Sequence, residues 1–118
     1  MKIKFYSYTP SGNVKFEAEG IQNKNTLSFI DKSFENTTLS ITVEEFGVNL
    51  ERVGGCTMNM HLEIGRKCPG HYKGADLEFD FIAEAKKIEI TEEKITLWYE
   101  LSINSNSYGL YKIFVVKK

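Results

Sequence analysis

The sequence predicts an all-β protein that folds as a closed antiparallel up-and-down β-barrel of about eight to ten strands. Two observations predict this class. Ile, Val, Thr, Phe, Tyr and Trp favour strands and make up 40 of the 118 residues, whereas Ala, the strongest helix former, occurs four times. Apolar and polar residues also alternate along most of the chain, with glycines between the alternating stretches. A barrel is expected because closure removes the exposed edges of a sheet, and a two-sheet β-sandwich is the alternative.

The alternation defines the strands in order. The chain opens with two strands joined by a short turn, and the polar side chains of the second strand share one face. A loop is expected at residues 31–36, with Phe34 as a possible plug over one end of the barrel, and Gly54-Gly55 divides a long alternating stretch into two strands. A short helix at residues 82–87 is the main alternative to strand in that segment. Strands are expected at about residues 2–8, 13–19, 27–29, 39–43, 46–53, 56–64, 77–85, 95–103 and 110–116, with a possible tenth at 88–90.

Length and charge limit the function classes. At roughly 150 residues per domain, residues 1–118 form one domain. Lys and Arg number 15 against 16 for Asp and Glu, a net charge of −1, so no nucleic-acid or membrane partner is expected. The chain has neither a long apolar run nor the pattern of a signal peptide, which predicts a soluble cytoplasmic protein.

Five short motifs follow one another along the chain: Arg52-Val53-Gly54, Met58-x-Met60, Gly70-x-Tyr72 with Gly74 after it, Tyr99-x-Leu101 and Gly109-x-Tyr111. This pattern resembles the YwiB-like family of small bacterial proteins of unknown function, and the resemblance extends from Ile3 to Val115. It implies a calycin-like, lipocalin-type barrel. It carries over no functional residue, and Cys68-Pro69-Gly70-His71 departs from the family pattern.

Two cysteines and two histidines have the ligand count of a zinc site: Cys56, His61, Cys68 and His71. Parity argues against this site, because Cys56 shares the apolar face of its strand whereas His61 points to the opposite face. A Cys56–Cys68 disulfide and a Cys68 nucleophile beside His71 are further alternatives. In a reducing compartment we expect two free thiols, two surface imidazoles, and no metal or other cofactor.

Arg52 lies in an otherwise apolar row of alternate residues. An arginine inside a barrel must find a carboxylate or several carbonyl groups. Arg52 would therefore either anchor the acid group of a ligand, or pair with a carboxylate of the chain near the rim of the barrel. The second interpretation is favoured.

Two functions follow from the predicted barrel, and no catalytic constellation supports an enzyme. The first is a binding barrel that holds a small apolar or amphipathic ligand in its lumen. The second is a filled barrel that acts through its outer surface as a protein-interaction module or a homodimer. The candidate lumen residues are Arg52, Met58, Met60, Phe79, Phe81 and Tyr99. The candidate interface residues are Trp98, Phe114 and Val116.

Overall fold

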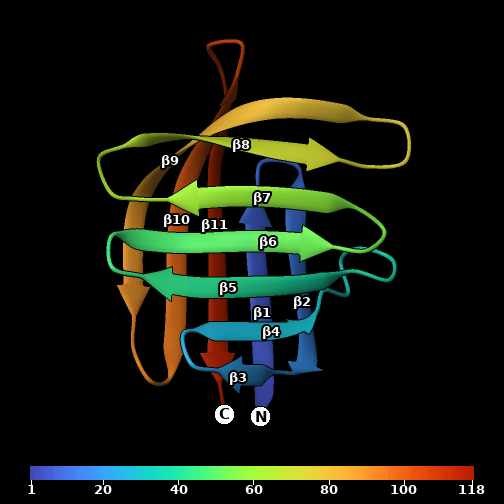
Figure 1. The fold of residues 1–118 in the computed structure, drawn as a ribbon, viewed down its shortest axis with the longest axis vertical. Helices are drawn as coiled ribbons and strands as arrows, with labels where there is room; N and C mark the ends of the chain where they lie inside the picture. Colours follow the sequence, from blue (N-terminus) through green and yellow to red (C-terminus); the bar gives the residue numbers. More distant parts are fainter.

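The computed structural model describes residues 1–118 and contains eleven strands and no helix (Figure 1). Apolar and polar residues alternate in most of these strands. Successive side chains of a strand point to opposite faces of the sheet, so the apolar residues pack inward and the polar residues face solvent. The strands are β1 (Lys2–Thr9), β2 (Gly12–Glu19), β3 (Ile21–Asn23), β4 (Thr26–Ile30), β5 (Thr38–Glu44), β6 (Gly47–Val53), β7 (Thr57–Leu62), β8 (Lys67–Lys73), β9 (Glu78–Ile90), β10 (Lys94–Ile103) and β11 (Asn106–Lys117).

All eleven strands belong to one antiparallel sheet, in the order β2-β1-β11-β10-β9-β8-β7-β6-β5-β4-β3. Every neighbour in this order is also a neighbour in sequence, except that β1 pairs with β11 and thereby joins the two ends of the chain. The predicted all-β up-and-down barrel is confirmed, and the continuous sheet replaces the sandwich alternative. The two edge strands of the sheet, β2 and β3, follow each other directly in the chain, so the two edges lie close together. They do not pair with each other, and the barrel is therefore nearly closed. This architecture is consistent with the calycin-like fold that the family resemblance implies.

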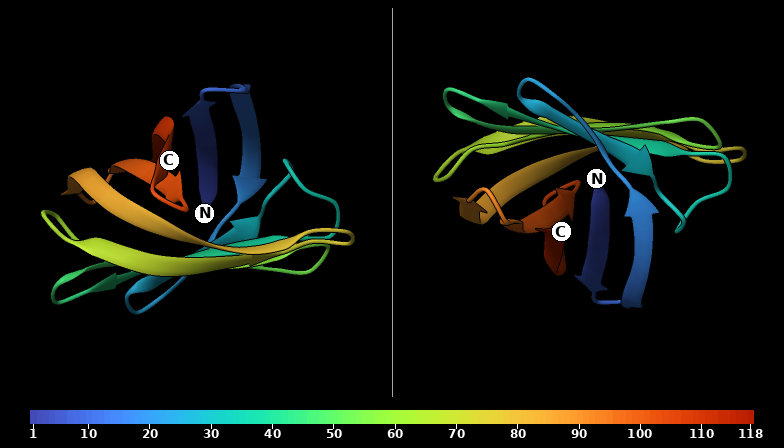
Figure 2. Two further views of the ribbon diagram at one scale, coloured as in Figure 1. Left: turned by 90° about the horizontal axis from the view of Figure 1, so that it is seen from above. Right: turned by 90° about the horizontal axis from the view of Figure 1, so that it is seen from below.

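The sheet wraps into two layers whose strands cross at a steep angle. Figure 1 shows β4 to β8 running across β1, β2, β10 and β11, and Figure 2 shows the two layers from above and from below. The long strand β9 passes from one layer to the other. Its register with β10 shifts at Lys86, where Trp98 pairs with Lys87 but Tyr99 pairs with Ala85. Such a bulge bends a strand, so the segment at 82–87 is bent strand and not the alternative helix.

The strand count exceeds the predicted eight to ten because alternation does not reveal β3 and β8. Strand β3 has three residues, too few to show a period. Strand β8 contains Pro69 and Gly70, residue types that strands usually exclude. Pro69 is tolerated because the pairing of β8 with β7 stops at Gly70, so that the proline lies beyond it.

A core of nineteen buried residues fills most of the space between the layers. Phe5 stacks on Phe16 with ring centroids 4.8 Å apart, and Phe29 lies 5.7 Å from Phe5. These rings fill the lumen beside β1, β2 and β4. No element of the structure is a helix with the length and apolarity of a membrane span.

Candidate functional site

The lumen is not filled at its other end, where a pocket of about 290 Å³ remains. This volume corresponds to about ten water molecules at about 30 Å³ each. Ten of the fourteen lining residues are hydrophobic. The lining includes all six residues predicted to face a lumen ligand: Arg52, Met58, Met60, Phe79, Phe81 and Tyr99. It also includes Ser7, Thr9, Val14, Ser33, Phe34, Tyr72, Leu101 and Tyr111.

Strand register assembles the pocket wall in rows across the sheet. Arg52 pairs with Met58, Met58 with Tyr72, and Tyr72 with Phe79, so that one row crosses β6 to β9. Directly paired residues have their side chains on the same face of a sheet. The alternation that predicts each strand therefore also places its inward residues beside those of the next strand.

A second row depends on a glycine. Met60 pairs with Gly70, and Gly70 pairs with Phe81. A Cβ atom at position 70 would lie 2.4 Å from the ring of Phe81 and 2.9 Å from the carbonyl oxygen of Asn59. The missing side chain of Gly70 thus leaves the space in which the Phe81 ring lies, and Phe81 forms part of the pocket wall.

Arg52 is held by a buried carboxylate. Its Nε donates a hydrogen bond of 2.8 Å to Oδ2 of Asp31, whose side chain has no exposed surface. The backbone N–H of Ser33 donates to the other carboxylate oxygen of Asp31, at 2.9 Å. The favoured interpretation of Arg52 is therefore the one observed: it pairs within the chain, at the edge of the lumen.

Phe34 lies at this end of the barrel, as the plug hypothesis expects. The Arg52 guanidinium is 5.0 Å from the centroid of its ring, within cation–π range. Only the Nε of Arg52 makes a hydrogen bond within the chain, so its two terminal nitrogens have no hydrogen-bond partner there, and Arg52 lines the pocket. The pocket thus has a mainly apolar wall with one cationic donor group.

The Gly54-Gly55 turn, which the sequence predicts, keeps Asp31 in place. A Cβ atom at Gly54 would lie 1.8 Å from the carbonyl oxygen of Asn36, and φ of Gly54 is +139°, in a region that favours glycine. The N–H of Gly55 donates to this same carbonyl, at 3.2 Å. The glycine pair therefore lets the loop that carries Asp31 pack directly against the end of β6.

Paired aromatic rings complete the wall. Tyr99 stacks on Tyr111 with centroids 5.6 Å apart, and Tyr72 stacks on Phe79 at 5.2 Å. Burial raises the pKa of Tyr99 to about 12, and the Arg52 charge offsets only part of that effect. Tyr99 therefore remains a neutral phenol even at a pH where an exposed tyrosine ionises, and it adds no charge to the pocket.

Asp31, Tyr72 and Tyr111 are site residues that were not singled out from the sequence. Asp31 stands in a polar segment that resembles any surface loop. The one available signal was the need of Arg52 for a carboxylate, which does not say which of sixteen acidic residues supplies it. Tyr72 and Tyr111 belong to the motifs that carry the family resemblance, but the resemblance assigns no function to either residue.

The cysteines and histidines do not gather at one site, and no group of three or more metal-ligating side chains is present. Cys56 and Cys68 are buried free thiols near opposite ends of the β7–β8 pair, which rejects the disulfide alternative. His61 bonds Asn49 at 2.6 Å, and His71 bonds Asp80 and Glu78 at 2.6 and 2.8 Å. Both imidazoles are thus engaged by polar groups and neither contacts a thiol.

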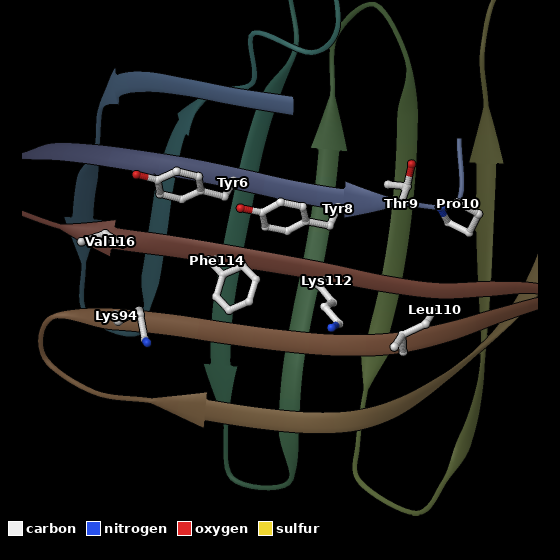
Figure 3. A pocket seen from close by; sticks show the side chains of 9 residues that line it. All are labelled: Tyr6, Tyr8, Thr9, Pro10, Lys94, Leu110, Lys112, Phe114 and Val116. Carbon is white, nitrogen blue, oxygen red and sulfur yellow. The ribbon is translucent and has the colours of Figure 1, made fainter. Parts of the chain in front are cut away.

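The predicted interface residues lie on the outer wall. Phe114 and Val116 line an outer groove on β1, β10 and β11, which Figure 3 shows. Trp98 faces outward beside Lys112, with which it pairs, but it is only partly exposed. The ammonium groups of Lys112 and Lys87 lie 4.2 and 4.9 Å from its ring centroid. Two lysine side chains therefore cover part of the Trp98 ring.

Comparisons with known proteins identify a solved structure of similar fold and a matching family. The crystal structure of ywiB protein from Bacillus subtilis is similar with a TM-score of 0.65, over 97% of this chain and 85% of that chain, at 18% sequence identity. At this identity the likeness concerns the fold. No curated protein matches the sequence. The model of a domain of unknown function, DUF1934, matches residues 9–115, nearly the whole barrel. The YwiB-like resemblance is thereby confirmed, and the chain belongs to the DUF1934 family.

Proposed function

We propose that the protein is a non-catalytic, lipocalin-like binding barrel that holds one small amphipathic molecule in its lumen. The observation that carries this proposal is the pocket of about 290 Å³ that joins a mainly apolar wall to Arg52. A dry apolar cavity of about 150 Å³ binds benzene, so this pocket accommodates a molecule about twice that size. The apolar part of the ligand would lie against Met58, Met60 and Phe81, with a hydrogen-bond acceptor near Arg52.

The charge of the site favours a neutral ligand. Asp31 already neutralises Arg52 in a buried pair. A ligand carboxylate would place a second negative charge beside Asp31 in a poorly solvated pocket, which is unfavourable. A hydroxyl or carbonyl oxygen can accept a hydrogen bond from a terminal nitrogen of Arg52 without this penalty. We therefore expect an alcohol to bind more tightly than the acid of the same chain length.

The lining supports binding without catalysis. Its hydroxyl groups include those of Ser7, Thr9 and Ser33, but none of the fourteen lining residues is a Cys, His, Asp or Glu. The lining therefore offers these hydroxyls no carboxylate or imidazole to act as the general base that a serine or threonine nucleophile needs. The proposal also includes a cytoplasmic location, because two buried free thiols fit a reducing compartment.

The test uses octanol and octanoate as probes. With methyl-labelled methionine, the protein gives three methyl signals, from Met58 and Met60 in the pocket and from Met1 outside it. Octanol is expected to shift the Met58 and Met60 signals in a saturable manner and to leave Met1 unchanged. Calorimetry gives the affinities of the two probes. Absence of saturable shifts with either probe would refute the binding function, and tighter binding of octanoate would refute the neutral ligand.

A pair of matched variants controls for non-specific effects. Val14 lines the pocket and is 39% exposed, whereas Val53 is 53% exposed and lies outside the pocket. Val14→Trp should fill part of the pocket and abolish octanol binding, and Val53→Trp should leave it intact. Equal effects of the two variants would show that octanol binds elsewhere.

A further inference from the structure

The outer face of the sheet carries a second hollow, a groove of about 710 Å³ over β1, β10 and β11 (Figure 3). Its floor and walls include Tyr6, Tyr8, Leu110 and Phe114. The lumen pocket lies on the opposite face of the same strands, and Thr9 is the one residue that lines both. The groove is therefore a separate surface that the proposed lumen function does not use.

Aromatic side chains stand in neighbouring rows on this face. Tyr6 pairs with Phe114, Tyr8 pairs with Lys112, and Lys112 pairs with Trp98 on the next strand. The rings of Tyr8 and Phe114 are 5.8 Å apart in an edge-to-face arrangement, and Tyr8 is 42% exposed. Three adjacent strands thus display aromatic side chains on a single outer surface.

The charge of the groove has one sign. Lys94 and Lys112 line it and no Asp or Glu does. Lys15 faces the same side, because it pairs with Tyr6. None of these three lysines forms an ion pair with a carboxylate. The surface therefore combines aromatic side chains with three lysines that form no ion pair. Glu17, which pairs with Lys4, and Glu100, which pairs with Leu110, face the same side but do not line the groove.

The net charge of −1 is a total for the whole chain and does not show that the groove is lined by lysines alone among charged residues. A different hollow, of about 490 Å³, is formed by the β5–β6 turn, Ile64 and the end of β9, and it carries Glu44, Glu45 and Glu63 and no lysine or arginine. The linings of the two hollows thus carry charges of opposite sign, whereas elsewhere acidic and basic residues are interspersed, as in the Lys4–Glu17 and Lys87–Glu89 pairs. The sequence-based expectation of no nucleic-acid partner used only the total charge, which does not describe the groove.

We propose that this groove binds single-stranded nucleic acid. Unpaired bases would stack on Tyr6, Tyr8 and Phe114, and phosphates would contact Lys15, Lys94 and Lys112. Stacking on aromatic side chains together with a cationic groove is the usual way in which proteins hold single strands without reading their sequence. A duplex offers no unstacked base to these rings, because its bases are already stacked on one another, so it would contact only the lysines.

The experiment measures the fluorescence anisotropy of a labelled oligodeoxythymidine of about a dozen nucleotides, within the range of known site sizes. Binding is expected at low salt, with a duplex of the same length competing poorly. Tyr8→Ala should weaken binding at least about fivefold, the fold-change that corresponds to the loss of one stacked base. Phe46→Ala is the matched control, since Phe46 is 70% exposed in the β5–β6 turn, outside the groove.

Salt dependence tests the lysines separately. Each phosphate contact on a single strand contributes about 0.7 to the slope of log affinity against log salt concentration. Lys94→Gln and Lys112→Gln should each lower that slope by about this amount. Lys73→Gln, an exposed lysine on β8, should leave it unchanged. Lys94 and Lys73 are exposed, whereas Lys112 is half-buried beside Trp98. Circular dichroism therefore checks that each variant keeps the fold before its slope is compared.

Three results would overturn the proposal. They are no binding of the oligonucleotide at low salt, equal affinity for single strand and duplex, or equal losses in the groove variants and their controls. Concentration-dependent dimer formation that Phe114→Ser abolishes, without oligonucleotide binding, would instead identify the groove as an interface between copies of this chain. None of these results affects octanol binding at Met58 and Met60, so the two proposals fail independently.

Discussion

The Nε of Arg52 lies 2.8 Å from Oδ2 of Asp31, a carboxylate with no exposed surface. The two residues are 21 positions apart, and they connect the loop after β4 to the inner face of β6. A buried carboxylate without a partner is very unfavourable. The pair therefore has a structural role that is separate from any ligand contact, and it also fixes the orientation of the cation at the pocket.

Replacing only one partner of this pair should destabilise the protein. Arg52→Met leaves the Asp31 carboxylate buried without its cation, and such a loss costs about 3–5 kcal/mol in the free energy of unfolding. The double variant Asp31→Asn/Arg52→Met should be more stable than Arg52→Met alone, because no isolated charge remains. Urea denaturation of the single and double variants measures both effects.

The control for this pair is an exposed one. Lys87 and Glu89 are 3.7 Å apart, with side chains 43% and 50% exposed. Glu89→Gln should change the free energy of unfolding by no more than about 1 kcal/mol. If Arg52→Met lowers the free energy of unfolding by no more than Glu89→Gln does, the structural role assigned to the Asp31–Arg52 pair is wrong.

Gly70→Ala should both destabilise the barrel and reshape the pocket. The added Cβ would lie 2.4 Å from the Phe81 ring, so the ring must move toward the pocket. Overpacking of this kind costs about 1–3 kcal/mol. The double variant Gly70→Ala/Phe81→Leu removes the ring and should recover part of the stability. No recovery would mean that the contact with the Asn59 carbonyl, and not the ring, causes the loss.

His71 should give the protein a stability change around neutral pH. Its hydrogen bonds to Asp80 and Glu78 raise the pKa of His71 above the ordinary 6.5. The folded state therefore binds this proton more tightly than the unfolded chain does. The resulting stabilisation is complete below about pH 6.5 and is lost as the pH rises through the raised pKa.

The measurement compares the wild-type protein with His71→Gln. Denaturation midpoints across neutral pH should fall in the wild type and should change less in the variant. NMR titration of the His71 ring should show a lower pKa after Asp80→Asn. An unchanged ring titration in that variant would contradict the assigned cause.

The sequence predicted the inward residues because their signal is local. Alternation within each strand identified all six predicted lumen residues, and an antiparallel meander brings such residues together whatever the details of register. Within β9 the inward positions change from odd numbers, at Ala83 and Ala85, to an even number, at Ile88, and this change is visible in the sequence. The structure explains this change by the bulge at Lys86.

The remaining features depend on contacts between distant residues. Asp31 becomes a site residue only because the Gly54-Gly55 turn packs against residues 35–37. The outer groove arises because β1 pairs with β11, which brings Tyr6 beside Phe114. Neither the total charge nor the alternation of residues predicts that β1 pairs with β11. Local patterns therefore predicted the barrel wall, the need of Arg52 for a carboxylate and the outward direction of Phe114. They did not predict that Asp31 supplies the carboxylate or that Tyr6 lies beside Phe114.

Tyr99 should make the protein sensitive to alkali. Burial raises the pKa of Tyr99 from 10.0 to about 12, so the folded state retains a proton that the unfolded chain loses at a lower pH. The stability from this group is complete below about pH 10 and is lost as the pH rises to about 12. The slope is at most one proton, about 1.4 kcal/mol per pH unit.

Tyr99→Phe removes this phenol and keeps the ring that stacks on Tyr111. The difference in unfolding free energy between wild type and variant should therefore be constant below about pH 10, and should then shift in favour of the variant. Tyrosinate absorbance follows the ionisation directly. Tyr108→Phe is the control, because Tyr108 is exposed and lies outside the pocket. If both variants show the same alkaline profile as the wild type, Tyr99 does not titrate as a buried group.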